Sequence, residues 1–475
     1  MKKVIIIGAG ITGLSAGINA LLKGHDVSIY EKNNFVGGCC NGWYRDNVYI
    51  DNCMHWLTGT NQHTKLFKLW KKIGAIDETS NLYQSKYFYK SELNGESISL
   101  LCNTEKTRND MIKLSPEDRK EIDKFINTVN FLIVTNKSNN FLKNICANTY
   151  SYTKCFFKYH KLSLYDLAKK FKHPLLKRMF TDYLPGSYSS LCLLYAYATF
   201  ASGNGKIYKN GSKEFSENIR NKFLDLGGNL YLEHNVSKIN IENNKFASII
   251  VNDKCVKGEI LISCIDPYYL FNNLLNENYI PKKLSEKKLN KNNYSTISSY
   301  HCAFLTNKDS LKFKDSIIFE IPNIQVGLKQ INRLLIKDYS YLYPNSDKTV
   351  IQAFIIQDTE DYEYWCHIYN NNKSEYNSIK QNIAYKIMDT LISKDKNLKD
   401  NIKLLDSWTP ITYNNYFNTY YGSYMGFVLK KKMNINKLSP KIKDLKNIYY
   451  LSYWQNSIGG LPVAAKLGNS IKKYL

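Results

Sequence analysis

Apolar and polar positions follow a regular pattern over the first thirty residues. Val4–Ile7 is a short run of β-branched residues, which is typical of a buried strand in a parallel sheet. Apolar residues between Leu14 and Leu21 then recur with helical spacing, and the helix is expected to end at Gly24. Asp26–Tyr30 has the pattern of a second strand. The order of strand, helix and strand predicts a Rossmann-like α/β fold.

Glycines occupy the junction between the first strand and the helix, in the order Gly8-Ala9-Gly10-Ile11-Thr12-Gly13. Gly8 suits a tight turn, and Gly10 leaves room for a pyrophosphate at the positive end of the helix. Gly13 allows the helix to pack closely on the strand. Glu31 follows the second strand, where it can accept hydrogen bonds from both ribose hydroxyls and disfavours a 2′-phosphate. The pattern therefore predicts an ADP-containing dinucleotide, either FAD or NAD.

A second glycine pair, Gly37-Gly38, follows Glu31 closely. It favours FAD, because plain NAD dehydrogenases lack such a pair. Residues 31–59, EKNNFVGGCCNGWYRDNVYIDNCMHWLTG, resemble the phytoene desaturase and retinol saturase branch of the flavin amine oxidase superfamily. The resemblance implies an FAD-dependent oxidoreductase. It departs from the family at Cys39, where many members have an arginine that helps to hold the cofactor.

Two later segments extend the resemblance. Residues 448–468 combine a predicted strand, Ile448–Ser452, with Gly459-Gly460-Leu461-Pro462 and a helix, which would face the flavin and its ribityl chain. Residues 203–271 contain a predicted strand whose Val236 would offer its backbone to the adenine. The cofactor-binding residues implied by pattern and resemblance are Gly8, Gly10, Ile11, Thr12, Gly13, Glu31, Lys32, Gly37, Gly38, Val236, Gly460, Leu461 and Pro462.

The matching segments are separated along the chain, which indicates a discontinuous FAD-binding domain. We assign residues 1–75, 203–275 and 430–475 to this domain, and residues 76–202 and 276–429 to an inserted α+β substrate-binding domain. The first insert has mostly helical patterns. The second begins with the alternation YSTISSYHCAFL, which predicts a sheet.

Resemblance to the family implies hydride transfer between flavin N5 and a carbon of a hydrophobic substrate, as in desaturation, saturation or isomerisation. His55 and Asp51 are the candidate catalytic groups for proton transfer, and His55 is the better one because its ordinary pKa is near 6.5. Tyr424 and Trp454 are candidates for the substrate channel, with Trp454 at a position beside the flavin, although either can equally be a core aromatic.

Other classes of protein remain as alternatives. A flavin amine oxidase shares the cofactor motifs, and a non-redox isoprenoid-binding protein of the GDP-dissociation-inhibitor type shares the fold. A disulfide reductase would need a C-x4-C pair after the second glycine pair, and the positions expected for the second cysteine hold Tyr44 and Arg45. No closed set of zinc ligands has a known spacing, so no metal site is predicted.

Composition indicates which partners and which cellular compartment to expect. The 475 residues carry a formal charge of +24, and the excess of lysine is spread along the chain, so we expect no nucleic-acid partner. Residues 154–178 are denser in cations, which suits either peripheral contact with an anionic membrane or an ordinary solvated helix. Eleven cysteines without compact spacing indicate a reducing compartment. No apolar run reaches the ~18 residues of a spanning helix. We therefore expect a cytoplasmic protein.

Overall fold

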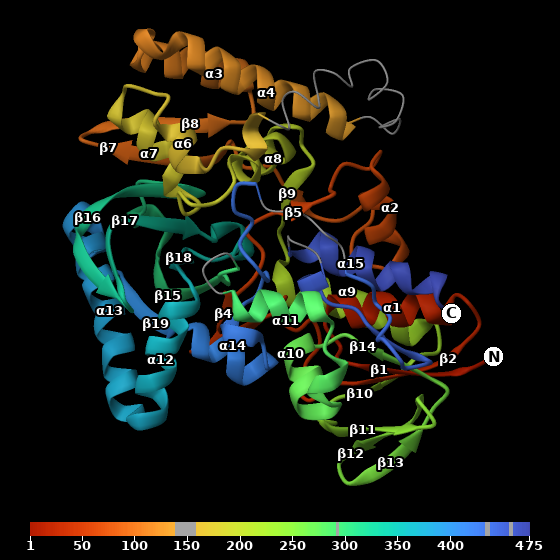
Figure 1. Cartoon of the computed structure of the whole chain (residues 1–475). Helices are drawn as coiled ribbons and strands as arrows, with labels where there is room; N and C mark the ends of the chain where they lie inside the picture. Colours follow the sequence, from red (N-terminus) through yellow and green to blue (C-terminus); the bar gives the residue numbers. More distant parts are fainter. Residues whose placement is uncertain (138–157, 291–293, 433–437, 456–458) are drawn as a thin grey trace.

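A parallel sheet of five strands is built from segments that lie far apart in the sequence (Figure 1). The computed structural model describes residues 1–137, 158–290, 294–432, 438–455 and 459–475. In order across the sheet, the strands are β10 (Asn229–Tyr231), β2 (Asp26–Tyr30), β1 (Lys3–Ile7), β14 (Ile260–Ser263) and β20 (Ile448–Tyr450). The predicted Rossmann-like fold is confirmed, and β20 ends two residues before the predicted end at Ser452.

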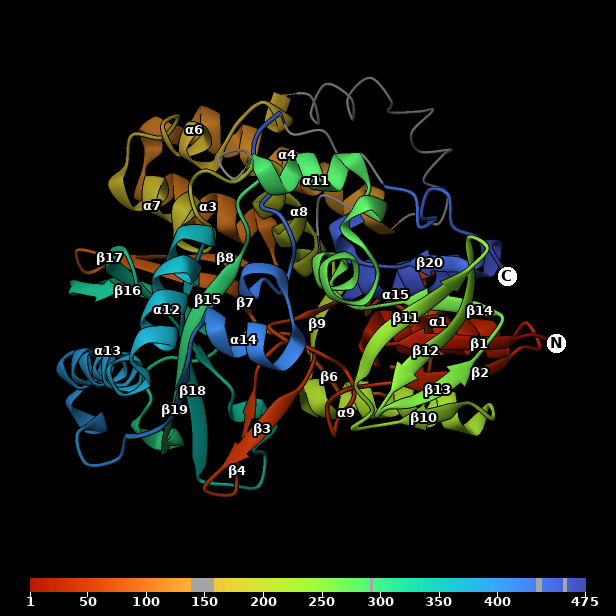
Figure 2. The same cartoon turned by 60° about the horizontal axis from the view of Figure 1, so that its bottom comes forward.

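The two faces of the parallel sheet are covered by different layers. Val4 and Ile6 of β1 pack against helices, whereas Ile5 and Ile7 pack against a small antiparallel sheet, as expected from the alternation of side chains along a strand. Figure 2 shows this small sheet beside the parallel sheet. The helices are α1 (Ile11–Leu21), α9 (Gly211–Asp225) and α15 (Leu461–Ser470). The small sheet consists of β11 (Val236–Glu242), β12 (Lys245–Val251) and β13 (Lys254–Lys257).

Close backbone contacts join α1 to β1 and to α15. A Cβ atom on Gly13 would lie 1.9 Å from the carbonyl oxygen of Gly8, so only glycine fits there. On the other side of α1, a Cβ on Gly468 would lie 2.5 Å from the Thr12 carbonyl oxygen. The hydroxyl of Ser15 donates a hydrogen bond to the Ala465 carbonyl at 2.9 Å. The N-terminal glycine segment and α15 are therefore held in direct contact.

A second, mixed sheet of seven strands lies beside the first unit (Figure 1). In order across the sheet, its strands are β19 (Lys403–Trp408), β15 (Ser298–Asn307), β18 (Lys348–Gln357), β17 (Lys329–Asp338), β16 (Ser316–Val326), β7 (Tyr87–Leu93) and β8 (Glu96–Leu101). Neighbouring strands are antiparallel except β16 and β7, which are parallel. The strand pattern that predicted a sheet at residues 294–305 corresponds to β15.

Helices cover this sheet on two sides. One apolar core joins it to α12 (Thr359–Asn371) and α13 (Lys373–Lys394). Another joins β7 and β8 to the helices of the first insert, which are α3 (Thr104–Leu114), α4 (Arg119–Lys137), α6 (Leu164–Ala168), α7 (Pro174–Asp182) and α8 (Ser190–Ala201). The first insert is therefore largely helical as predicted, but its β7–β8 hairpin was not predicted from the sequence.

Short elements connect the larger units. They include α2 (Lys65–Lys72), α10 (Pro267–Tyr269), α11 (Lys282–Leu289), α14 (Pro410–Phe417), β3 (Gly42–Arg45), β4 (Val48–Asp51), β5 (Leu57–Thr58), β6 (Leu82–Tyr83) and β9 (Gly205–Tyr208). The central strand β9 pairs with both β5 and β6. The division of the chain into two domains at the boundaries given above stays a prediction.

Candidate functional site

A cavity of about 650 Å³ extends from the glycine segment between β1 and α1 to the seven-stranded sheet. Gly10 and Glu31 line one end, and His301 of β15 and Phe354 of β18 line the other. Residues between α7 and the middle of α8, from Tyr183 to Ala196, contribute a further apolar wall. The cavity thus connects the predicted dinucleotide site with a compartment formed by the two inserts.

The two glycine segments line the end of the cavity that contains Gly10 and Glu31. The amide of Gly37 donates a hydrogen bond to the Ala9 carbonyl at 2.9 Å, so the second glycine pair lies directly on the first segment. Gly37 has φ +96° and a Cβ there would lie 2.4 Å from the Ser216 hydroxyl. A Cβ on Gly10 would have no neighbour nearer than 4.0 Å, and Gly10 lines the cavity. Space for a ligand group is therefore open at the N-terminus of α1.

Glu31 lies at the end of β2 and lines the same part of the cavity. Its Oε2 accepts a hydrogen bond from the Ala9 amide at 2.8 Å, and its Oε1 accepts bonds from the backbone and side-chain nitrogens of Asn33 at 3.0 and 2.9 Å. Burial raises the pKa of Glu31, while these hydrogen bonds oppose the rise. Lys32 also lines the cavity, and its ammonium donates to Asn418 Oδ1 at 2.9 Å.

The remaining predicted cofactor residues approach the cavity from other segments. Val236 opens β11, and Gly460, with φ +99°, precedes the first residue of α15; both line the cavity together with Leu461 and Pro462. The hydroxyl of Thr419 is buried there without a hydrogen-bond partner among the described residues. An open helix N-terminus, a carboxylate after β2 and an unused hydroxyl fit a bound dinucleotide.

The two candidate proton-transfer groups lie in different surroundings. His55 lines the cavity and is half-buried, and desolvation, then the positive charge of Lys337, lowers its pKa well below 6.5. Asp51 is not one of the lining residues. Its carboxylate accepts hydrogen bonds from the Ser212 amide at 2.6 Å, the Ser212 hydroxyl at 2.8 Å and the Cys53 amide at 3.0 Å. Asp51 therefore anchors the start of α9, and only His55 is kept in the proposed site.

Lys337 of β17 is a buried cation behind this wall of the cavity. Its ammonium donates a hydrogen bond to the His55 carbonyl at 2.6 Å, and only 2% of the residue is exposed. It forms no ion pair with any carboxylate in the described part of the chain. Burial lowers the pKa of Lys337 to about 8. The lysine thus fixes the backbone that carries His55 and disfavours a second positive charge nearby.

Substituting methionine for Lys337 should change how stability depends on pH. The unfolded chain keeps this proton up to the ordinary lysine pKa of 10.5, whereas the folded chain releases it near pH 8. Between these values the unfolded state binds more protons, so this group adds stability as the pH rises, by at most about 1.4 kcal/mol per pH unit. The free energy of unfolding of the wild type minus that of Lys337→Met should therefore increase across this window in urea titrations. If this difference in the free energy of unfolding did not change with pH, Lys337 would not be a buried cation. Lys348→Met, at an exposed position of β18, is the control.

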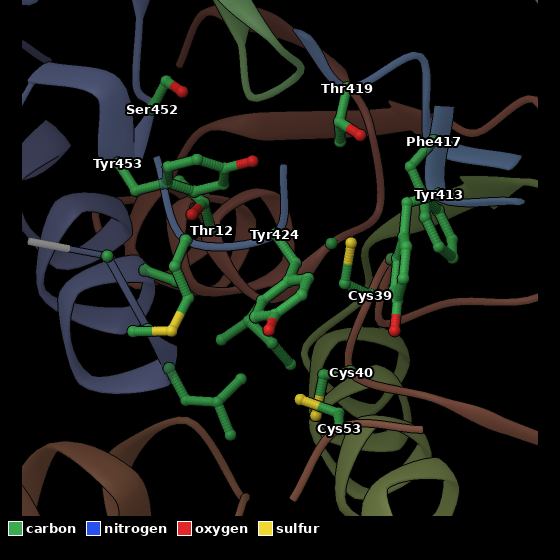
Figure 3. Close-up of a pocket in the computed structure, with 18 of the residues that line it drawn as sticks. Thr12, Cys39, Cys40, Cys53, Tyr413, Phe417, Thr419, Tyr424, Ser452 and Tyr453 are labelled. Carbon is green, nitrogen blue, oxygen red and sulfur yellow. The ribbon is translucent and has the colours of Figure 1, made fainter. Parts of the chain in front are cut away.

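The two aromatic candidates, Tyr424 and Trp454, also lie in different surroundings. Tyr424 lines the cavity and projects between Tyr453 and Cys39 (Figure 3). Trp454 does not line it: its indole is fully buried and donates a hydrogen bond to Asp266 Oδ2 at 2.7 Å. Trp454 is therefore a core residue, which was one of the two alternatives for it.

Several lining residues were not singled out from the sequence. Three of them directly follow the carboxyl end of β14: Cys264, Ile265 and Asp266. Ligands in α/β folds bind outside the carboxyl ends of parallel strands, so this rule could have identified them. Burial raises the pKa of Asp266 to about 6, although four hydrogen bonds from its surroundings oppose the rise.

The two cysteines that follow the second glycine pair, Cys39 and Cys40, both line the cavity. Cys39 occupies the position where the resemblance expects arginine, and burial raises the pKa of its thiol to about 12. Figure 3 places Cys40 and Cys53 side by side. Within the described ranges, no group of three or more histidine, cysteine or acidic side chains could hold a metal ion.

Comparison with known proteins agrees with this geometry. Residues 6–73 match the family model described as "NAD(P)-binding Rossmann-like domain". The 1-hydroxycarotenoid 3,4-desaturase of Flavobacterium sp. (strain P99-3) is 22% identical over 487 residues, covering 98% of this chain and 96% of that protein. The 4,4'-diaponeurosporene oxygenase of Staphylococcus aureus (strain MW2) is 23% identical over 500 residues, covering 99% and 97%. The chain therefore resembles the phytoene desaturase-like branch of the FAD-dependent oxidoreductases.

A solved structure supports the fold of this chain. Putrescine oxidase bound to putrescine has a TM-score of 0.59 at 12% identity, over 100% of this chain and 98% of that one, which is a likeness of fold. No helix in the part of the chain that the structure describes is both long and apolar enough to cross a membrane. The cationic stretch 154–178 lies partly outside the described residues, and its contact with a membrane surface stays a prediction.

Proposed function

We propose that this protein binds FAD and catalyses desaturation, saturation or isomerisation at a carbon–carbon bond of a hydrophobic substrate. The observation that carries the proposal is the single cavity that joins the glycine segments to an apolar compartment between the inserts. The carotenoid-modifying names of the two sequence relatives support the same class of substrate. A cavity with this form would bring cofactor and substrate together away from water.

The residues that would hold FAD come from each part of the parallel-sheet unit. The N-terminus of α1 and Gly10 would receive the pyrophosphate, Glu31 the adenosine ribose, and Val236 the adenine. Gly460 and the N-terminus of α15 would lie beside the flavin. Bound FAD would supply the hydride acceptor or donor.

The chain's own contribution would be to orient the substrate and to handle a proton. His55 is neutral at physiological pH because burial and Lys337 lower its pKa, so a ring nitrogen is available to accept a proton. Among the described lining residues the carboxylates are Glu31 and Asp266, and both follow strands of the parallel sheet. The end of the cavity that lies between the inserts therefore offers no carboxylate to a cationic amine. This favours an uncharged substrate over the substrates of an amine oxidase.

Anaerobic reduction of the purified protein tests the proposal. The protein should show the visible absorbance of oxidised flavin, and an apolar polyene should bleach it if the reaction runs in the direction of desaturation. For saturation, the chemically reduced protein should be reoxidised by the polyene, and for isomerisation the polyene should change without net bleaching. Bleaching by amines alone would indicate an amine oxidase, and a colourless protein that binds isoprenoids would indicate the non-redox class.

A further inference from the structure

The pairing of β3 with β4 places two cysteines opposite each other. In this antiparallel hairpin, the pair of residues farthest from the turn is Gly42 and Asp51. The Asn52 amide then donates a hydrogen bond to the Asn41 carbonyl at 3.1 Å, so the pairing continues one residue beyond both strands. The next residue on each side is a cysteine. A pair that follows a hydrogen-bonded pair has its Cα atoms about 4.5 Å apart, which is within the range that a disulfide spans.

These two residues are Cys40 and Cys53, and their side chains are in contact. Figure 3 shows the two sulfur atoms next to each other, and the Cys53 thiol forms a hydrogen bond with the Cys40 sulfur. Both residues line the cavity, and both are free thiols. Cys40 is buried and Cys53 is half-buried. A small reagent that enters the cavity would therefore meet two thiols at one place.

Hydrogen bonds that involve α9 hold both cysteines in this position. The Ser216 hydroxyl donates to the Cys40 carbonyl at 2.5 Å. The Cys53 amide donates at 3.0 Å to Asp51, whose carboxylate also accepts hydrogen bonds from Ser212. Both backbone segments are thus fixed to the same helix. A bond between the two sulfur atoms would require little movement of the backbone.

Cys39 is not an equivalent partner for either thiol. A disulfide between the sequence neighbours Cys39 and Cys40 would close a strained ring. The Cys39 sulfur also points away from the other two sulfur atoms in Figure 3. The cross-strand pair is therefore the one that the geometry favours.

We propose that Cys40 and Cys53 form a site of reversible oxidation, at which hydrogen peroxide converts the two thiols into a disulfide. One sulfur would be oxidised to a sulfenic acid with release of one water molecule. The other thiol would then displace the hydroxyl group, which leaves as a second water molecule. Two electrons pass from the thiols to the peroxide. A small dithiol would reverse the reaction by exchange and would itself become a disulfide.

This inference goes beyond the proposed function and does not depend on a bound cofactor. The disulfide would join the segment after the second glycine pair to the segment that carries His55, two residues after Cys53. The hydrogen bond to Cys40, then burial, raises the pKa of the Cys53 thiol well above its ordinary value. Because the thiolate is the reacting form, oxidation should be slow at neutral pH and faster as the pH rises.

Tryptic mapping of the full-length protein tests the proposal. The protein is treated with hydrogen peroxide at mildly alkaline pH, unfolded in the presence of N-ethylmaleimide to block the remaining thiols, and digested without reduction. Cleavage after Arg45 separates Cys40, in residues 33–45, from Cys53, in residues 46–65. The two peptides should be found joined, with a mass two hydrogens below their sum, and dithiothreitol should separate them.

Cys39→Ser is the matched control, because it removes the other thiol of the same peptide and should leave the joined pair unchanged. Cys40→Ser and Cys53→Ser should each abolish the joined pair, and circular dichroism checks that these variants fold. Fragmentation of the joined wild-type peptides should assign the bond to Cys40 even if a variant does not fold. Separate peptides in the oxidised wild type, a bond assigned to Cys39, or a joined pair in folded Cys40→Ser would overturn the inference.

Discussion

Substituting alanine for Gly13 should give a chain that is much less stable and does not retain its dinucleotide. The added Cβ would lie 1.9 Å from the Gly8 carbonyl oxygen and 3.1 Å from its carbonyl carbon. Both atoms belong to the backbone that turns from β1 into α1, so no side-chain rotation can relieve the overlap. The helix would have to move away from the strand, which should cost about 3 kcal/mol or more. Urea unfolding and the flavin content of the purified protein measure the two effects.

Gly24→Ala is the matched control for Gly13→Ala, because Gly24 ends the turn that follows the same helix. It has φ +78° and a Cβ there would meet no atom within 4 Å. Alanine at Gly24 should therefore cost only the strain of a left-handed conformation, about 1–2 kcal/mol, and the dinucleotide should be retained. Normal stability and full flavin content in Gly13→Ala would show that the close contact between α1 and β1 is misplaced.

Substituting alanine for Glu31 should leave a folded chain that has lost its flavin. The carboxylate is the proposed acceptor for two ribose hydroxyls, and hydrogen bonds to a charged group are worth about 1.5–3 kcal/mol each, so affinity should fall about a hundredfold or more. The Ala9 amide would also lose its acceptor, which would loosen the glycine segment. Visible absorbance after gel filtration measures flavin occupancy, and circular dichroism checks the fold.

Glu31→Gln separates the contributions of charge and shape at this position. The amide keeps one oxygen acceptor of nearly the same geometry, so its loss of flavin should be smaller than that of Glu31→Ala. Full flavin occupancy in Glu31→Ala would rule out the ribose-binding role, whatever happens in Glu31→Gln.

The parts of the fold predicted from the sequence are those specified by neighbouring residues. β1, α1 and β2 follow from apolar spacing and from glycines whose physical roles are local. The β7–β8 hairpin carries a local signal that was not used: Asn94 and Gly95 both have positive φ between the two strands, and Asn-Gly is a favoured pair for such a turn.

The parts of the site that could not be predicted depend on contacts between distant residues. Asp51 is four residues before His55, so both seemed available for catalysis, but its carboxylate binds Ser212, 161 residues away. His301 lies on a strand buried on both faces, and the alternation of side chains does not indicate which face adjoins a cavity. Trp454 lies next to the lining residue Tyr453, but its side chain packs in the core.

The contact between α1 and α15 affects the order in which the protein can mature. Ser15 and Ala465 are 450 residues apart, and the ribosome must make both before they can meet. β20 and α15 complete one edge of the parallel sheet and one border of the cavity, so the nascent chain cannot enclose a flavin until they have emerged. The parallel strand pairing between β14 and β20 is a late event for the same reason. Loading of the proposed cofactor would therefore follow the synthesis of residue 470, where α15 ends.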